Sequence, residues 1–198
     1  MLNNITLHDA IYTQRAIRRF KPDPIPQATL DEILEAAMRA PSGSNRQPWY
    51  FIIVRDRELK LLIQEWYTER GKQMARGSYA TTNDWSFEEH MADAPALLVL
   101  CLRYWSGGSE PIVMGASVYP AIQNLMLAAR AFGVGTTITA RIHWKRDEAR
   151  QVLRLPEDVD PLIVIPMGYP EEPDHFGGSK RDPSSDHTFY DRWGVVKP

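Results

Sequence analysis

Three arginines stand within five residues near the amino terminus, in the run Gln14-Arg15-Ala16-Ile17-Arg18-Arg19-Phe20. Guanidinium groups bind phosphate and carbonyl oxygens through paired N–H donors. The run comes just before a Pro-rich turn. The cluster is therefore either a binding site for an anionic group or a solvated basic face, and the residues alone leave both interpretations open.

A second polar segment, Pro41-Ser42-Gly43-Ser44-Asn45-Arg46-Gln47-Pro48-Trp49, joins a predicted helix to a predicted strand. It offers hydroxyls, amides and free backbone N–H groups beside apolar bulk, and such a loop can hydrogen-bond the edge of a flat heterocycle. The alternative is a hydrogen-bonded turn with Trp49 in the core. Both interpretations fit the residues equally well.

Other kinds of chemistry find little support in the sequence. The five histidines show no metal-binding spacing, and the single cysteine, Cys101, cannot build a thiolate site. A nucleophile elbow of the G-x-S-x-G type is absent. The run Gly133-Val134-Gly135 follows a predicted helix and precedes a strand, which is the reverse of the order in dinucleotide-binding loops. We therefore expect no metal, and any nucleotide must be held by other means.

Hydrophobic periodicity predicts the elements that must position these residues. The first helix should have a capping box of Thr29 and Glu32 and stop at Pro41, Gly133 should end a later helix in the left-handed conformation, and Pro166 should finish the last strand. The expected helices cover 28–40, 58–75, the region around 118–129 and 146–153. The expected strands cover 50–54, 96–102, 136–139 and 161–167.

The chain is long enough for one layered α+β domain over residues 1–198. It carries 23 Lys and Arg against 25 Asp and Glu, so no bulk field attracts nucleic acid or an anionic membrane, and we expect neither as a partner. The lone cysteine and the absence of a signal-peptide pattern predict a cytoplasmic protein. The tail, from about 171 to 198, contains an aromatic segment that needs a surface to pack on.

Four segments, in order along the chain, resemble the FMN-dependent nitroreductase family. Together they cover nearly its whole length. The resemblance implies a nitroreductase-like mixed β-sheet flanked by helices, in an intertwined homodimer with FMN at the interface and the tail packed on the partner subunit. The segments are Arg15–Phe20, Ala40–Trp49, the passages 121–125 and 133–136, and 166–170.

The resemblance also assigns residues to the FMN site. It places Arg18 near N1 and O2 of the flavin, where a cation stabilises the charge of the reduced state. Gln14 stands where many members have arginine, and Ala16 where many have serine. These two differences affect contacts to the phosphate or the ribityl chain, and Arg15 is the residue that could replace them. The residues that match the segment binding the ribityl phosphate and the pyrimidine edge of the flavin are Gln14, Arg15, Ala16 and Arg18.

Three further groups complete the implied site. A loop from the other subunit faces the flavin ring system, backbone groups approach the ring near N5, and a basic carboxy-terminal pair reaches the phosphate. These groups are, in that order, Pro41, Ser42, Gly43, Ser44 and Asn45; Ile138 and Thr139; and Lys180 and Arg181.

The implied activity is transfer of hydride from NADPH or NADH, by way of flavin N5, to a nitroaromatic, a quinone or a similar small acceptor. No protein acid or base is obligatory, so no catalytic residue is assigned. The alternatives are reductive dehalogenation, reduction of an enamide or a deazaflavin precursor, flavin breakdown, or flavin binding without catalysis. Acceptor choice is assigned to the aromatic residues Trp66, Tyr67, Trp85 and Trp105, for each of which core or interface packing is an equal alternative. The polar stretch up to about His90 could form a lid.

Overall fold

The computed structural model describes residues 5–75, 85–104 and 111–196. Its centre is a four-stranded sheet in the order β1-β2-β4-β3, with every neighbouring pair antiparallel. Ala16 adds a parallel bridge to Thr136, so the amino-terminal segment extends the sheet beyond β3. The predicted α+β class with a mixed sheet is confirmed. The strands are β1 (Trp49–Val54), β2 (Ala96–Arg103), β3 (Gly135–Thr136) and β4 (Val159–Gly168).

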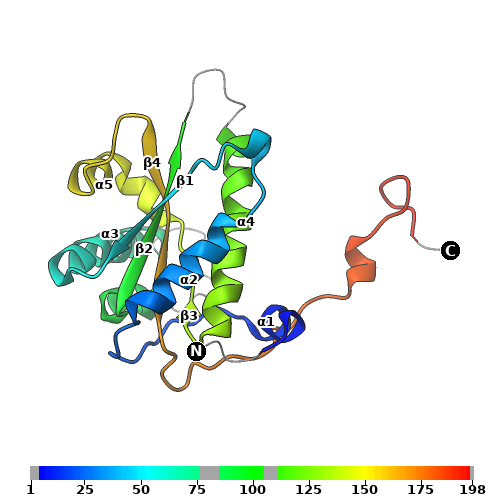
Figure 1. Ribbon diagram of the computed structural model, residues 1–198, viewed down its shortest axis with the longest axis horizontal. Coiled ribbons are helices and arrows are strands. Elements are labelled where there is room, and N and C mark those ends of the chain that lie inside the picture. Colours follow the sequence, from blue (N-terminus) through cyan, green and yellow to red (C-terminus); the bar gives the residue numbers. More distant parts are fainter. Residues whose placement is uncertain (1–4, 76–84, 105–110, 197–198) are drawn as a thin grey trace.

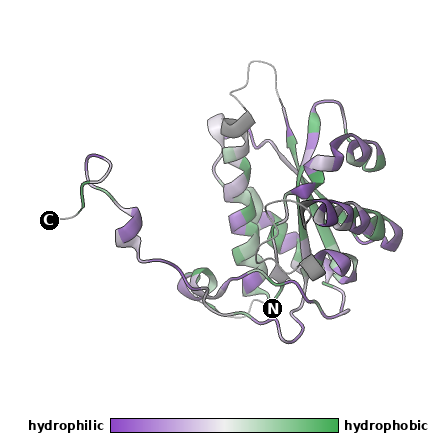
Figure 2. Ribbon diagram, turned by 180° about the vertical axis from the view of Figure 1, so that it is seen from behind, coloured by the Kyte–Doolittle hydropathy of each residue, from purple (hydrophilic) through white to green (hydrophobic). Residues whose placement is uncertain are grey.

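Helices cover both faces of this sheet (Figure 1). Alternate residues of β2 face opposite layers, so Leu98 and Leu100 pack with α2 and α4 while Leu97 and Val99 pack with α3 and α5. Figure 2 shows the result as hydrophobic central strands inside helices with hydrophilic outer faces. The helices are α1 (Leu7–Thr13), α2 (Gln27–Met38), α3 (Arg57–Ala75), α4 (Pro111–Ala131) and α5 (Arg146–Val152).

The limits of α2 differ from the sequence prediction. The helix begins at Gln27 with Pro26 as its N-cap, and no side chain caps it, so the capping box predicted for Thr29 and Glu32 is wrong. Helical geometry starts as soon as the Pro-rich segment ends, which leaves Thr29 already inside the first turn. The helix ends at Met38, before Pro41 is reached. Its buried stripe, Leu30, Ile33 and Ala37, has the expected spacing.

Pro166 interrupts a neighbouring strand rather than ending its own. β4 continues to Gly168, contrary to the prediction, and the strand expected over 136–139 splits into β3 and an isolated bridge between Thr139 and Val164. The register of β3 with β4 would pair Thr137 with Pro166 through hydrogen bonds. Pro166 has no N–H to donate, so the ladder breaks there and resumes at Thr139.

The predicted helix end at Gly133 is confirmed, with φ 73° at this residue. After β4 the chain runs past α1 and then away from the body of the molecule (Figure 1). Up to residue 196, where the described part of the chain ends, this tail holds one short 3-10 turn, η5 (Ser184–His187). Among the described helices, none is both long and apolar enough to cross a membrane.

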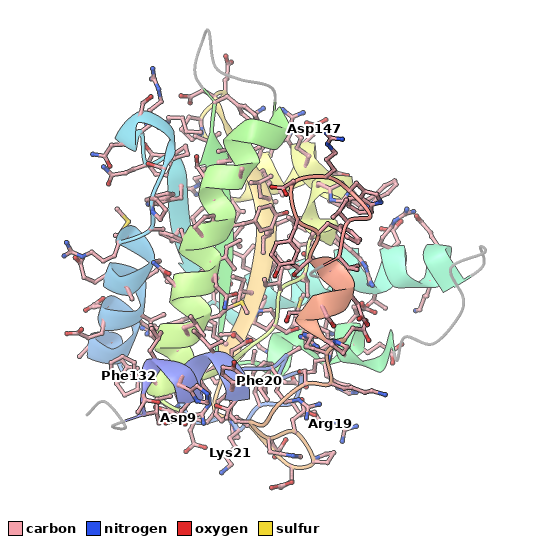
Figure 3. All side chains as sticks on the ribbon, turned by 90° about the vertical axis from the view of Figure 1, so that its right-hand side faces the viewer. Asp9, Arg19, Phe20, Lys21, Phe132 and Asp147 are labelled. Atoms are coloured by element: carbon pink, nitrogen blue, oxygen red, sulfur yellow. The ribbon has the colours of Figure 1, made fainter. Side chains whose placement is uncertain are left out.

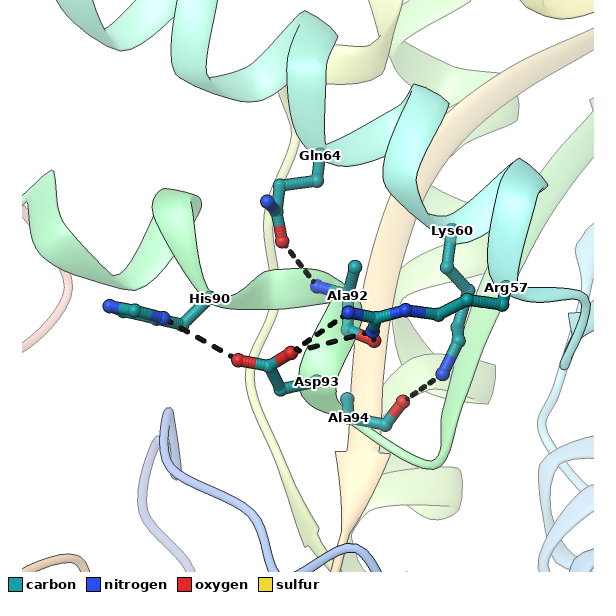
Figure 4. A network of polar contacts seen from close by, with 7 residues as sticks. All are labelled: Arg57, Lys60, Gln64, His90, Ala92, Asp93 and Ala94. Atoms are coloured by element: carbon teal, nitrogen blue, oxygen red, sulfur yellow. Dashed lines mark hydrogen bonds and ion pairs between the residues drawn. The ribbon is translucent and has the colours of Figure 1, made fainter.

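A polar network joins α3 to the short turn η3 (Met91–Asp93) that leads into β2 (Figure 4). Lys60 is only 7% exposed, and its Nζ donates to the Ala94 carbonyl at 2.6 Å. Arg57 Nη1 donates to the Ala92 carbonyl at 2.6 Å, and the Ala92 N–H donates to Gln64 Oε1 at 2.8 Å. These bonds satisfy backbone groups that helix and sheet leave unpaired.

We expect Lys60→Met to lower the free energy of unfolding by about 1–3 kcal/mol, because the Ala94 carbonyl loses its buried donor. Burial lowers the pKa of Lys60 below its ordinary value of 10.5. At a pH between the lowered pKa of the folded protein and 10.5, Lys60 binds more protons in the unfolded chain than in the folded one. Its contribution to the free energy of unfolding therefore rises with pH in this range. The advantage of the wild type over Lys60→Met should therefore grow as pH rises toward 10.5 in urea unfolding experiments. A difference in unfolding free energy between the two proteins that does not change with pH would contradict the lowered pKa of Lys60.

Candidate functional site

The arginine-rich segment is held to the sheet by its backbone. The Ile17 N–H donates to the Thr136 carbonyl at 3.0 Å, and the Ile17 side chain is fully buried. Gly135 allows this close approach, because a Cβ at that position would lie 2.7 Å from Ile17 Cβ. With Ile17 turned inward, Arg15 and Arg18 are exposed on either side of it. The strand-like pairing thus presents two guanidinium groups at the edge of the sheet.

The start of the tail clamps the same segment from its other side. The Asp174 carboxylate accepts the backbone N–H groups of Arg18 at 2.6 Å and of Arg19 at 3.1 Å. Three backbone bonds extend the contact, and they join Lys21 to Tyr169 at 2.8 Å, Glu171 to Arg19 at 3.1 Å, and Gly177 to Thr13 at 3.0 Å. The two stretches run antiparallel. Figure 3 shows Arg19 and Lys21 at the outer edge of the molecule.

Arg130 links α4 to this arrangement, and sequence reasoning did not single it out. Its guanidinium lies 4.2 Å from the centre of the Phe176 ring, and its Nε donates to Thr13 Oγ1 at 2.9 Å. Lys180 and Arg181 follow a few residues after the last anchoring bond and are exposed. Their proposed contact with the phosphate stays a prediction, as does the contact of Gln14 and Ala16, which are half-buried here.

The polar loop after α2 has unusual backbone geometry. Ser44, Asn45 and Gln47 have φ values of 52°, 53° and 50°, in the left-handed region that residues other than glycine rarely adopt. The 3-10 turn η1 (Gly43–Asn45) is held by the Gln47 N–H on Ser42 Oγ at 3.0 Å. Strained positions of this kind cluster at functional sites. Trp49, by contrast, lies in the core, as the turn interpretation requires.

Within one chain, the polar loop after α2 and the residue before the arginine segment contact α4 at well-separated points. The loop contacts the amino-terminal half of α4, where the Gly43 N–H donates to Ser117 Oγ at 3.2 Å. Thr13, which directly precedes the arginine segment, contacts the other end of α4 through Arg130. Thirteen helical residues separate Ser117 from Arg130, which corresponds to about 20 Å. Pro41 to Asn45 therefore form a surface of their own.

Ile138 and Thr139 lie where Pro166 breaks the ladder. Ile138 is 41% exposed, whereas Thr139 exchanges backbone hydrogen bonds of 3.0 and 2.9 Å with Val164. The Thr139 hydroxyl also turns inward and donates to the Val164 carbonyl at 2.7 Å. Of the two residues, Ile138 is thus the exposed one, and Thr139 anchors it to β4.

Two of the aromatic residues predicted to choose the acceptor are core residues instead. Trp66 and Tyr67 are buried in the layer between α3 and the sheet, so their assignment to acceptor choice is wrong. Helical spacing turns both toward this layer. The side chain of Trp85 and all of Trp105 lie outside the described residues, as do residues 76–84 of the predicted lid.

The described residues offer few reactive side chains. Cys101 is fully buried in β2, and burial raises the pKa of its thiol to about 12, with a further contribution from Asp160. It therefore stays protonated and acts as a small apolar residue. No group of three acidic, histidine or cysteine side chains within the described ranges could hold a metal ion. The exposed cations and the strained loop remain as the chemical features of this surface.

Comparison with known proteins identifies the class to which this fold and surface belong. Residues 11–169 match the Nitroreductase family. A relative from Methanothermobacter thermautotrophicus, provisionally named NADH dehydrogenase/NAD(P)H nitroreductase, is 32% identical over 83% of this chain and 77% of its own. An iodotyrosine deiodinase from Thermotoga neapolitana is 29% identical over 84% of this chain and 90% of its own.

A solved structure gives the same result at the level of the fold. An oxidised iodotyrosine deiodinase bound to FMN and 3-iodo-L-tyrosine aligns with a TM-score of 0.77 and 25% identity, over 96% of this chain and all of that chain. The chain described here belongs to the nitroreductase family. Asp174 and the rest of the tail lie beyond residues 11–169, which match the family.

Proposed function

We propose that this protein is an FMN-dependent oxidoreductase that carries hydride from NADPH or NADH to a small acceptor. The observation that carries the proposal is the arginine segment, whose backbone is fixed between β3 and Asp174 while Arg15 and Arg18 stay exposed. A fixed backbone with free guanidinium groups is suited to an anionic, hydrogen-bonding ligand. The family membership and the FMN-bound structural neighbour support FMN as that ligand.

The chemistry of the donors fits FMN. Phosphate and the pyrimidine carbonyls accept hydrogen bonds, and Arg15, Arg18 and the Gln14 amide can donate them. Ser42, Ser44 and Asn45 add hydroxyl and amide donors on the strained loop. When bound, FMN supplies the two-electron redox chemistry, which no side chain of this protein can provide.

The roles of the chain's own residues follow from their charge and anchoring. Arg18 would hold positive charge beside the pyrimidine edge, where negative charge develops on reduction. Arg15, with Lys180 and Arg181, would bind the phosphate. Ile138 would pack against the ring system and exclude water from it, held in place by Thr139.

We propose that a second copy of the chain completes the site. About 20 Å of α4 lies between the points where it contacts Thr13, directly before the arginine segment, and the Pro41–Asn45 loop, so we assign the loop that faces the same ligand to the partner. Each copy also exposes apolar side chains that a homodimer would cover. They are Leu7, Ile11, Tyr12, Tyr119 and, in the tail, Trp193, which is 90% exposed. Of the tail from about 171 to 198, the part up to Gly177 is bonded to its own chain, and the remainder would pack on that partner.

The identity of the acceptor has two candidates. Nitroaromatic and quinone acceptors suit an open, cation-lined surface and the nitroreductase name of one relative. A halogenated aromatic acceptor is the second candidate, because deiodinases are among the relatives and a structural neighbour binds 3-iodo-L-tyrosine. We also propose a cytoplasmic location, where NADPH and NADH supply the reductant and the buried Cys101 thiol stays reduced.

The visible spectrum of the purified protein tests the proposal. We expect flavin absorption bands at about one FMN per subunit, a dimer by size-exclusion mass, and bleaching when NADPH or NADH is added without oxygen. Adding acceptors in turn should restore the bands, and release of iodide from 3-iodo-L-tyrosine would select the second candidate. A colourless protein that takes up no added FMN would overturn the proposed function.

A further inference from the structure

Tyr67 is a buried hydrogen-bonding residue that the proposed function does not yet use. It lies on α3, is 1% exposed, and its hydroxyl donates to the Thr139 carbonyl at 3.2 Å. The same oxygen accepts the Ile142 N–H at 3.2 Å and lies 3.1 Å from the Thr139 hydroxyl. The phenol therefore uses its one donor on the Thr139 carbonyl and an acceptor position on the Ile142 N–H. Burial raises the pKa of Tyr67 well above its ordinary value, which keeps this donor protonated.

These bonds replace the part of the sheet that Pro166 removes. Between Thr136 and Thr139 the ladder lacks the pair that Thr137 would make with Pro166. Tyr67 reaches the far side of that gap from α3 and connects Thr139 to Ile142, at the start of the 3-10 turn η4 (Arg141–Lys145). The path of Ile138 across the gap is therefore set by Val164 on one side and by Tyr67 on the other.

The same helix holds the segment that follows residues 76–84. Thr68, next to Tyr67, donates its hydroxyl to the Glu88 carbonyl at 3.2 Å in the turn η2 (Trp85–Glu89). The Glu88 carboxylate is 8% exposed and forms an ion pair with Arg141 of η4. One stretch of α3 thus holds both η2 and η4, which makes it the common support of this part of the site.

We propose that Tyr67 is a positioning residue for the redox site: its hydroxyl holds the Thr139 carbonyl and, through Thr139, fixes the position of Ile138 against the bound cofactor. The inference rests on the proposed function, because it takes Ile138 and Thr139 to face FMN. Tyr67 itself touches no ligand, since its side chain is buried in the core. Removal of its hydroxyl should leave the fold intact and loosen this one stretch of chain.

The test is Tyr67→Phe, which keeps the ring and removes only the hydroxyl. In hydrogen exchange, the Ile142 amide should exchange about tenfold faster than in the wild type, while amides in β2 keep their rates. The affinity for FMN should fall about three- to tenfold, and the absorption bands and midpoint potential of the bound flavin should shift. Thr139→Val, which removes the neighbouring hydroxyl, should change the same quantities in the same direction.

Tyr50→Phe is the matched control. Tyr50 also accepts a hydrogen bond, from Arg103 Nη1 at 2.7 Å, but on the outer strand β1 and far along the sheet from β3. It should leave exchange at Ile142, FMN affinity and potential unchanged. Equal effects of both variants, or a Tyr67→Phe protein with wild-type flavin properties, would overturn the inference alone. A wild-type protein that binds no FMN would overturn the proposed function and this inference together.

Discussion

Replacing Arg18 with alanine should weaken FMN binding about a hundredfold. A hydrogen bond to a charged group contributes about 1.5–3 kcal/mol, and Arg18 is the guanidinium assigned to the pyrimidine edge. Its backbone does not depend on the side chain, because Ile17 is fixed to Thr136 and the Arg18 N–H is fixed to Asp174. Fluorescence titration of the flavin-free protein with FMN measures the affinity, and the flavin potential should also fall as the reduced state loses its cation.

Arg19→Ala is the control for this experiment. Arg19 is the next residue, is equally exposed, and donates its backbone N–H to the same carboxylate oxygen of Asp174. Net charge and local backbone therefore change alike in the two variants. We expect Arg19→Ala to bind FMN within about threefold of the wild type, as general screening of surface charge predicts. Equal losses in both variants would show that only overall positive charge matters.

The second large effect is expected at Gly135. A methyl group there would lie 2.7 Å from both Cβ and Cγ1 of Ile17, a fully buried side chain. Overpacking of this kind costs about 1–3 kcal/mol. Gly135→Ala should lower the melting temperature, and relief of the clash should move Ile17 away from β3. That movement would displace Arg15 and Arg18, so FMN affinity should fall as well.

Gly177→Ala provides the comparison, since it makes the same change near the same segment. Gly177 donates its N–H to Thr13, and an added Cβ would find its nearest neighbour, His175 Cδ2, at 3.9 Å. Stability and FMN affinity should both remain close to wild type. A Gly135→Ala protein as stable as Gly177→Ala would mean that the Ile17 contact is not a close one in solution.

Much of the core could be predicted from the pattern of hydrophobic residues in the sequence. The unbroken apolar run of β2 predicts a strand covered on both faces, and the stripe on α2 predicts the face that packs on α4. Both follow from the periods of strand and helix, which are local properties of the chain. The arginine cluster was also visible, but the sequence did not show that Ile17 turns inward and leaves Arg15 and Arg18 exposed.

Errors arose where a distant residue decides local structure. The strand over 136–139 was predicted from its β-branched residues, yet Pro166, some thirty residues later, divides it. Trp66 and Tyr67 were predicted to face an acceptor, and packing of α3 on the sheet buries them. Left-handed backbone at Ser44, Asn45 and Gln47 had no signal in the sequence, because none of them is glycine.

The sequence by itself determined the layered α+β core, the family and the residue types that can bind an anionic flavin. Only the tertiary structure decided how they are arranged, through contacts such as Arg18 with Asp174, 156 residues apart. It also decided that Tyr67 supports Thr139 and that about 20 Å of α4 separates the polar loop from the arginine segment. Local preferences act over a few residues, whereas these arrangements depend on which distant surfaces pack together.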